Sequence, residues 1–322
     1  MISRGAEIKR EVGNSTRSRA VNKSPAMLRT FLALALLLAS LRADDRLVVD
    51  DQVLIARYTA ATEELQKTGK LVSFKTLRTQ LNRASSELQL PAPRKDKLSP
   101  QEVYRTVRES TVVVGTFFKC TKCKAWHFDS SSGFVVADGV VSTCHHVVQF
   151  EDKRMREGYL VVVDVGGRVY PVTEVLAANA DADTCLLRVA DLALKPLALN
   201  PSAEVGERVF CLGHPDGNHW MFTEGLLSRY FINREEAETG KKVKPSLYIN
   251  VTAEYSPGSS GAPIVDECGN VVGQVESITA SWESEPVEKG KPVAASYGMP
   301  LRACIAAEEI AKLAVKAEPA KQ

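Results

Sequence analysis

The strongest constraint on the fold comes after Ser110, where short runs of β-branched and aromatic residues are separated by Gly, Asp and Asn. Runs of this kind, with turn residues between them and no helical spacing in the intervals, are typical of antiparallel strands. Many such strands in succession favour closed antiparallel barrels. We therefore predict a mainly β fold. The expected strands cover residues 111–118, 133–143, 159–165, 168–177, 184–190, 207–213, 220–232, 246–252, 262–266, 270–279 and 293–299.

A helical region precedes the strands. Ala, Leu, Glu and Lys dominate from Val53 to about Leu88, Gly69 offers a stop, and Ser73 is a suitable cap for a second helix. We interpret this region as a helical hairpin. The second helix would present an apolar stripe of Phe74, Leu77, Leu81 and Leu88.

A linker and a short helix connect this region to the strands. Two prolines, Pro91 and Pro93, mark the linker. Ser99 and Glu102 form a capping box around a Pro at the first helical position, which predicts a helix through Val107. Helical spacing returns from 302 to 316. The expected divisions are a leader and signal peptide (1–43), a helical region and linker (44–98), a barrel domain (99–303) and a C-terminal helix and tail (304–322).

The leader is identified by charge and hydropathy. The formal net charge of the chain is +2, but residues 1–43 hold eight Lys and Arg against two Glu, which leaves 33 basic and 37 acidic residues in the rest. That balance does not indicate a nucleic-acid partner. Residues 31–41 form an apolar run too short to span a bilayer, as in a signal peptide. We expect translation to start at Met27, cleavage near Ala43, and export to the periplasm or exterior.

Two other interpretations of the leader stay open. The apolar run would also fit a buried helix of an unprocessed cytosolic protein, or an uncleaved anchor, which would be the chain's only membrane attachment.

The clearest chemical motif is a turn that presents a hydroxyl. Ser260 stands between small residues in the sequence GSSGAP at 258–263, directly before an apolar strand. Acyl transfer needs a nucleophile on such a tight turn, so that backbone N–H groups converge on the developing oxyanion. Gly258 and Ser260 would supply those N–H groups. Taken alone, the motif would also fit a plain Gly/Ser loop between strands.

Two further motifs offer a base and an acid. A strand ending in Thr-x-x-His carries His145 and His146, and an imidazole suits general-base chemistry at neutral pH. Adjacent residues point in different directions, so only one of the two can face the nucleophile. Asp183 comes directly before a buried strand and would orient that imidazole, whereas Asp181 fits a solvated turn.

Together, the motifs of the chain resemble the protease domain of the HtrA family of trypsin-like serine proteases. The resemblance extends over about 105–303 and the order His, Asp, Ser is that of chymotrypsin-type folds. It implies two six-stranded β-barrels with the site between them, His146 rather than His145 as base, Asp183 as its acid and Ser260 as nucleophile. Its elements are SSGFVV with a following DG, Thr143–Val147, Asp183–Leu187, GERVFCLGHPDG at 206–217, TEGLLS at 223–228 and GSSGAPIV at 258–265.

The chain departs from the family pattern at three places. Ala262 replaces a Gly, which changes little. Ser259 stands where HtrA proteins usually have Asn and digestive relatives have Asp, so no activation by pairing with a new N-terminus is expected. No PDZ domain of the usual HtrA kind fits in residues 304–322.

Glu254 is a candidate specificity residue. It stands six positions before Ser260, at the place that forms the base of the primary specificity pocket in trypsin-like folds, where an acid would attract Lys or Arg of a substrate. Against this, HtrA-like pockets usually accept small aliphatic side chains, and Glu could fold back to solvent.

Cys120, Cys123 and His127 form a second candidate site. Lys124 replaces the His of a haem-attachment motif, so haem is not expected. Three interpretations stay open: a structural zinc that needs a fourth ligand, a local disulfide, or free thiols. The seven cysteines of the chain are an odd number, so at least one thiol is unpaired or bridges two chains.

The sequence thus predicts a serine endopeptidase that acts on exported or unfolded polypeptides and requires no cofactor. One rival is a catalytically silent barrel domain that binds proteins. Another is a metal-dependent hydrolase built on the cysteine pair and a His. The sequence does not indicate the oligomeric state.

Overall fold

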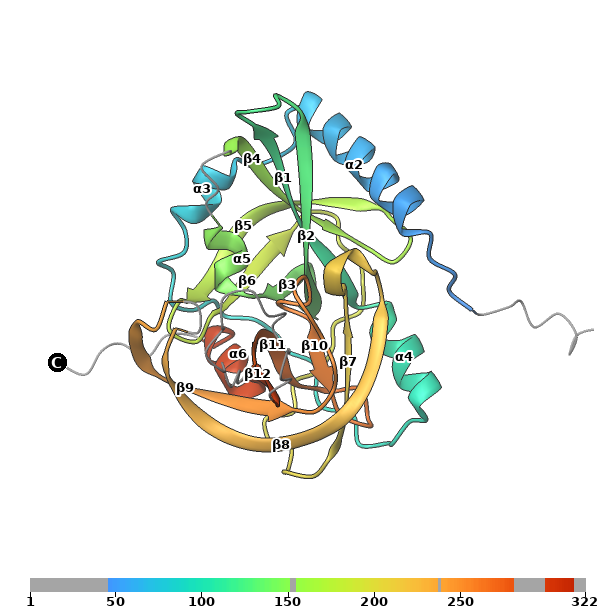
Figure 1. The fold of residues 1–322 in the computed structure, drawn as a ribbon, viewed down its shortest axis with the longest axis vertical. Coiled ribbons are helices and arrows are strands. Elements are labelled where there is room, and N and C mark those ends of the chain that lie inside the picture. The colour runs from blue at the N-terminus through green and yellow to red at the C-terminus, as the bar shows by residue number, and fades with distance from the viewer. Residues whose placement is uncertain (1–45, 151–154, 237–238, 281–298, 316–322) are drawn as a thin grey trace, which may run out of the picture. The chain divides into compact units, whose positions relative to one another are not determined.

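The fold was obtained as a computed structural model that describes residues 46–150, 155–236, 239–280 and 299–315 (Figure 1). Its first barrel is closed and antiparallel, in the order β1-β2-β3-β6-β5-β4, with β4 pairing back onto β1. A tight turn at Asp138 and Gly139 separates β2 from β3, and Gly139 takes the positive φ of 67° that this turn requires. The strands are β1 (Thr111–Cys120), β2 (Trp126–Ala137), β3 (Val140–Thr143), β4 (Met155–Val163), β5 (Val169–Asn179) and β6 (Thr184–Val189).

The second barrel is also closed, in the order β10-β11-β12-β9-β8-β7. Alternating side chains of its strands fill the interior, among them Val209, Leu227, Ile249 and Val272, all fully buried. The prediction of two six-stranded antiparallel barrels is confirmed. The strands are β7 (Arg208–Gly213), β8 (Met221–Glu235), β9 (Lys242–Val251), β10 (Pro263–Val265), β11 (Val271–Ala280) and β12 (Pro300–Ala306), and a 3-10 turn covers Pro215–Gly217.

The last strand corrects the sequence prediction. Residues 302–306 were expected to be helical, but they belong to β12, which pairs with β9 and β11 and so closes the second barrel. The helix α6 starts only at Ala307 and ends at Leu313. The expected strand at 293–299 falls almost wholly outside the described residues, and the expected domain limit at 303 lies within β12.

The helices before the barrels begin at the predicted caps. Ser73 Oγ accepts from the amide of Thr76 at the start of α3 (Phe74–Arg78). Ser99 and Glu102 form the expected capping box of α4 (Pro100–Arg108). The longest helix, α2 (Asp51–Lys67), ends just before Gly69, whose φ is 69°. A short helix of the first barrel, α5 (His145–Gln149), lies between β3 and β4 in the chain.

The second arm of the expected helical hairpin is shorter than predicted. After α3 the chain runs extended along both barrels. The amide of Ala178 donates to Arg83 O, the amide of Leu88 donates to Ala314 O, and the amide of Leu98 donates to Glu267 O. Long-range backbone pairing therefore replaces helix formation at Leu88, whereas Leu81 lies in a turn where its amide donates to the carbonyl of Arg78. The linker crosses both barrels.

The expected signal peptide and start at Met27 lie outside the described residues. In the part of the chain that the structure does describe, none of the helices has the length and apolar character needed to cross a bilayer.

Candidate active site

The two adjacent histidines occupy the first turn of α5, directly after β3. His145 is buried, and this burial lowers its pKa from the ordinary value. The side chain of His146 is 41% exposed and borders a cavity. The helical turn sends the two rings in different directions, so His146 is the histidine available for chemistry.

Asp183 holds His146 by two atoms. Its Oδ1 accepts from the backbone amide of His146 at 2.8 Å, and its Oδ2 lies 2.6 Å from Nδ1 of the same residue. Because a carboxylate only accepts, Nδ1 carries the proton, and Nε2 is the ring atom able to take another. Asp183 has a φ of 49°, a left-handed conformation that Asp tolerates better than most residues.

Asp181, the alternative acid, is engaged elsewhere. Its Oδ1 accepts from the amide of Lys244 at 3.2 Å.

Ser260 lies on a tight turn before β10. Its Oγ donates a long hydrogen bond of 3.5 Å to the carbonyl of Glu276. The next residue must be Gly, because Gly261 has a φ of 88° and a Cβ there would stand 2.1 Å from the carbonyl oxygen of Ser132. The turn therefore packs directly against β2 of the first barrel.

One hydrogen bond orients the peptide bond between Pro257 and Gly258, two residues before Ser260. The carbonyl of Pro257 accepts from the amide of Asp216 at 2.7 Å. In a trans peptide the next N–H points the opposite way, so the amide of Gly258 points away from Asp216. Within the described part of the chain, no acceptor is recorded for the amides of Gly258 and Ser260. Both N–H groups are therefore candidates to meet a substrate oxygen.

Ser132 on β2 braces this turn from the other barrel. Its Oγ donates to the carbonyl of Gly258 at 2.9 Å and accepts from the amide of His214 at 3.1 Å, and its own amide donates to the carbonyl of Ser260 at 2.9 Å. The sequence analysis quoted Ser132 within a motif but gave it no role. These partners lie 82 to 128 residues away along the chain, so no local pattern points to them.

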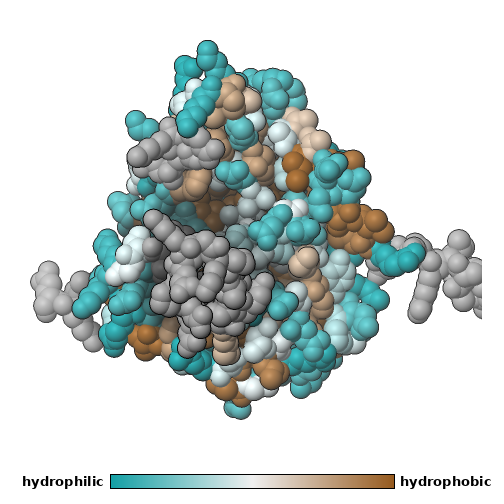
Figure 2. Space-filling model, in the orientation of Figure 1, coloured by the Kyte–Doolittle hydropathy of each residue, from teal (hydrophilic) through white to brown (hydrophobic). Residues whose placement is uncertain are grey.

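The three candidate catalytic residues line one cavity of about 400 Å³. On the face in Figure 2 the surface is hollowed where the two barrels meet. Charged residues from the β8–β9 hairpin, including Glu235, Glu236 and Lys242, form part of the wall.

Glu254 does not lie in this cavity, which corrects its expected place at the base of a specificity pocket. Its side chain is 78% exposed and lies 3.4 Å from Nη2 of Arg302. The neighbours Ala253 and Tyr255 are buried in the barrel, and the alternation of an extended chain turns Glu254 outward. The hydroxyl of Tyr255, which donates to the carbonyl of Ser277, fixes that alternation.

The residues of the second candidate site lie together in the structure. The ligand atoms of Cys120, Cys123 and His127 are within 4.8 Å of one another at the tip of the β1–β2 hairpin, and none of the three residues lines the cavity. All seven cysteines are free thiols. Cys144 and Cys185 are buried, and Sγ of Cys185 donates to the carbonyl of Cys144 at 3.7 Å.

Comparison with known proteins agrees with this architecture. Residues 131–273 match the family described as "Trypsin-like peptidase domain". "Protease Do-like 1, chloroplastic" of Arabidopsis thaliana is 29% identical over 150 residues, which are 45% of this chain and 32% of the relative. A "Probable periplasmic serine endoprotease DegP-like" of Ectopseudomonas mendocina (strain ymp) is 31% identical over 145 residues, 44% of this chain and 28% of the relative. The chain thus spans about a third of the length of these relatives.

Solved structures share the fold. The active form of the Rv3671c protease from M. tuberculosis has a TM-score of 0.50 at 20% identity, and the match covers 70% of this chain and 89% of that one. The HtrA-type protease AlgW, solved with a decapeptide, also has a TM-score of 0.50, at 16% identity, with 66% of this chain and 65% of that one covered.

Proposed function

We propose that this chain, which matches a trypsin-like peptidase domain over residues 131–273 and is similar to HtrA and DegP serine proteases, is a serine endopeptidase whose triad is His146, Asp183 and Ser260. The observation that carries the proposal is the two-point attachment of His146 to Asp183 at the cavity that Ser260 also lines.

The proposed reaction begins with attack of Ser260 Oγ on a peptide carbonyl. Nε2 of His146 takes the hydroxyl proton, while Asp183 keeps the Nδ1 proton in place and stabilises the imidazolium. The amides of Gly258 and Ser260 donate to the oxyanion of the tetrahedral intermediate. His146 then protonates the leaving amine. In the second half of the reaction, His146 takes a proton from the attacking water and returns it to Ser260 Oγ as the acyl-enzyme is hydrolysed.

The proposed substrates are exposed or unfolded segments of polypeptide. The cavity that the three triad residues line has a volume of about 400 Å³ and is also lined by side chains of β8, β9 and β11. A known relative in fold, AlgW, was solved with a decapeptide, which is consistent with a peptide ligand in this architecture. The proposed reaction requires no metal or organic cofactor.

Hydrolysis of a denatured protein tests the proposal. Ser260→Ala should keep the fold and lose about a million-fold in kcat, since triad members act as a unit. His146→Ala should cost nearly as much, and the matched control His145→Ala should cost far less. An inactive wild-type protein would favour the alternative of a silent, protein-binding barrel domain. Loss of hydrolysis on addition of a chelator, together with no loss on treatment with a fluorophosphonate, would favour a metal-dependent hydrolase.

We also propose that the protein is exported and begins near Asp44 after cleavage. The apolar run at 31–41 with its basic flank supports this, and one relative is described as periplasmic. N-terminal sequencing of exported material is the test. Recovery of the uncleaved chain in the cytosol would contradict it.

A further inference from the structure

The β1–β2 hairpin carries a group of side chains that the proposed peptidase reaction does not use. Cys120 ends β1, Cys123 lies in the turn, and His127 is the second residue of β2. Figure 1 shows this hairpin beside α2, and the ring of Phe128 packs 4.3 Å from that of Tyr58 on the helix. The group is therefore built into the first barrel and lies apart from the triad.

The backbone of the hairpin brings the three side chains to one face. His127 is the cross-strand partner of Phe118, and Phe118 and Cys120 share a face of β1 because side chains alternate along a strand. The amide of Cys120 donates to the carbonyl of Ala125 at 3.0 Å, which closes the turn and folds Cys123 back over that face.

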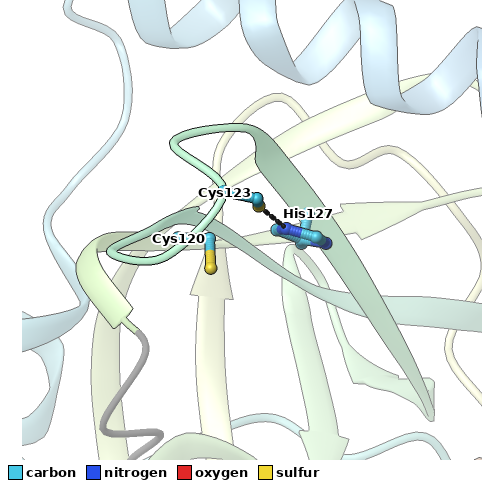
Figure 3. A group of neighbouring side chains, drawn as sticks. All are labelled: Cys120, Cys123 and His127. Atoms are coloured by element: carbon cyan, nitrogen blue, oxygen red, sulfur yellow. Dashed lines mark hydrogen bonds between the residues drawn. The ribbon is translucent and has the colours of Figure 1, made fainter.

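The ligand atoms are close to the spacing that a tetrahedral zinc ion needs. A dashed line in Figure 3 joins Cys123 and His127. Sγ of Cys123 lies 2.9 Å from Nε2 of His127, and all three ligand atoms lie within 4.8 Å of one another. With Zn–S and Zn–N bonds of about 2.3 and 2.1 Å, tetrahedral angles require about 3.8 Å between two sulfurs and about 3.6 Å between sulfur and nitrogen. Shifts of about an ångström would therefore complete the geometry.

The imidazole is already oriented toward such an ion. Its ring stacks on that of Phe118, with 5.4 Å between centroids and an interplanar angle of 21°. A disulfide would join only the two cysteines and would not involve His127, whereas a metal ion would be bound by all three side chains. Two thiolates and one imidazole are ligands that zinc prefers, and together they form a neutral centre with Zn²⁺.

We propose that Cys120, Cys123 and His127 bind one Zn²⁺ that clamps the β1–β2 hairpin, with water as the fourth ligand. Cys123 and the imidazole edge of His127 face solvent, so a water molecule can reach the ion, while Cys120 is buried. The bound ion would fix the start of β2. Ser132, five residues after His127 on the same strand, contacts the turn that carries Ser260.

Metal binding by the reduced, metal-free full chain tests this site directly. Titration with Zn²⁺ against a chromophoric chelator should give one equivalent, and Co²⁺ should give thiolate-to-cobalt charge-transfer absorption. Cys123→Ser and His127→Gln should each lose that equivalent and the absorption. Because both residues are exposed, these variants keep the fold, as circular dichroism can check. Cys268→Ser, a cysteine outside the group, is the matched control and should bind like the wild type.

Thermal unfolding supplies a second readout. Zn²⁺ should raise the Tm of the wild type and of Cys268→Ser but not of Cys123→Ser, because binding to the folded state stabilises it by mass action. Two results would overturn the proposal. One is the absence of stoichiometric binding in the reduced wild type. The other is equal binding by the wild type, Cys123→Ser and His127→Gln.

Discussion

Replacement of Ser132 by Ala tests whether the first barrel positions the nucleophile turn of the second. The substitution removes the hydroxyl that donates to the carbonyl of Gly258 and accepts from the amide of His214. Ser132 and His214 are both fully buried, so the amide of His214 is left without its acceptor in the interior. The turn that offers the amides of Gly258 and Ser260 then loses one of its supports.

The size of the effect follows from the lost hydrogen bonds. A buried polar group left unpaired costs about 1–3 kcal/mol. If displacement of the turn adds that cost to the activation free energy, kcat falls by roughly 5- to 150-fold, because about 1.4 kcal/mol corresponds to a factor of ten. KM should change little, since the oxyanion contacts strengthen only in the transition state.

Ser142→Ala is the matched control. Ser142 is also fully buried and also reaches the second barrel, where its Oγ donates to Oε1 of Gln274 at 2.6 Å. Both variants should lower the free energy of unfolding in urea, but only Ser132→Ala should lower kcat for a peptide substrate. If Ser132→Ala kept kcat within about twofold of Ser142→Ala, Ser132 would stabilise the fold without positioning the turn.

Three further predictions concern single residues. Gly258→Ala should lower kcat by about 10²- to 10³-fold, because Gly258 has a φ of 94° and a Cβ would stand 2.6 Å from the carbonyl oxygen of His214; an unchanged kcat would refute the oxyanion assignment. Burial lowers the pKa of His214 to about 3, below the unfolded value of about 6.5, so its contribution to stability is complete above pH 6.5 and is lost as the pH falls toward 3. Between pH 7 and 4, the free energy of unfolding in urea should fall with pH in the wild type by up to about 1.4 kcal/mol per pH unit more than in His214→Asn. Parallel pH curves for the two proteins would contradict this. Glu254→Ala should leave the cleavage preference on a denatured protein unchanged, because Glu254 faces solvent; a lost preference for Lys and Arg would place it at the substrate.

Local chemistry explains which parts of the fold could be predicted from sequence. The caps at Ser73 and Ser99 satisfy amides only three residues away, so they can be recognised in the sequence itself. The Asp138-Gly139 turn is equally local, although the single run predicted at 133–143 did not show that it divides two strands. The prediction of closed barrels succeeded because turn-punctuated, β-branched runs have few other ways to bury their apolar faces.

Long-range pairing explains what the sequence did not show. Arg302 to Ala306 have helical spacing, yet β9 and β11 supply backbone partners on both sides, and this pairing outweighs helix propensity. The same reason applies to Leu88, whose amide pairs with Ala314.

The candidate site shows the same division. His146, Asp183 and Ser260 were predicted from short motifs whose order matches a known family, and the structure brings them to one cavity. Glu254 was placed by counting from Ser260, which cannot show on which side of an extended segment a residue lies. Ser132 was missed because its role depends on contacts with the other barrel.

Reaction with a fluorophosphonate probe, followed by peptide mapping, tests the central claim most directly, because it requires both an activated hydroxyl and an oxyanion site. We predict stoichiometric labelling of the wild type at Ser260, no labelling of Ser260→Ala, and strongly slowed labelling of His146→Ala. Labelling at another residue, or hydrolysis of protein by enzyme in which Ser260 stays unlabelled at saturating probe, would contradict the assignment of Ser260 as the nucleophile.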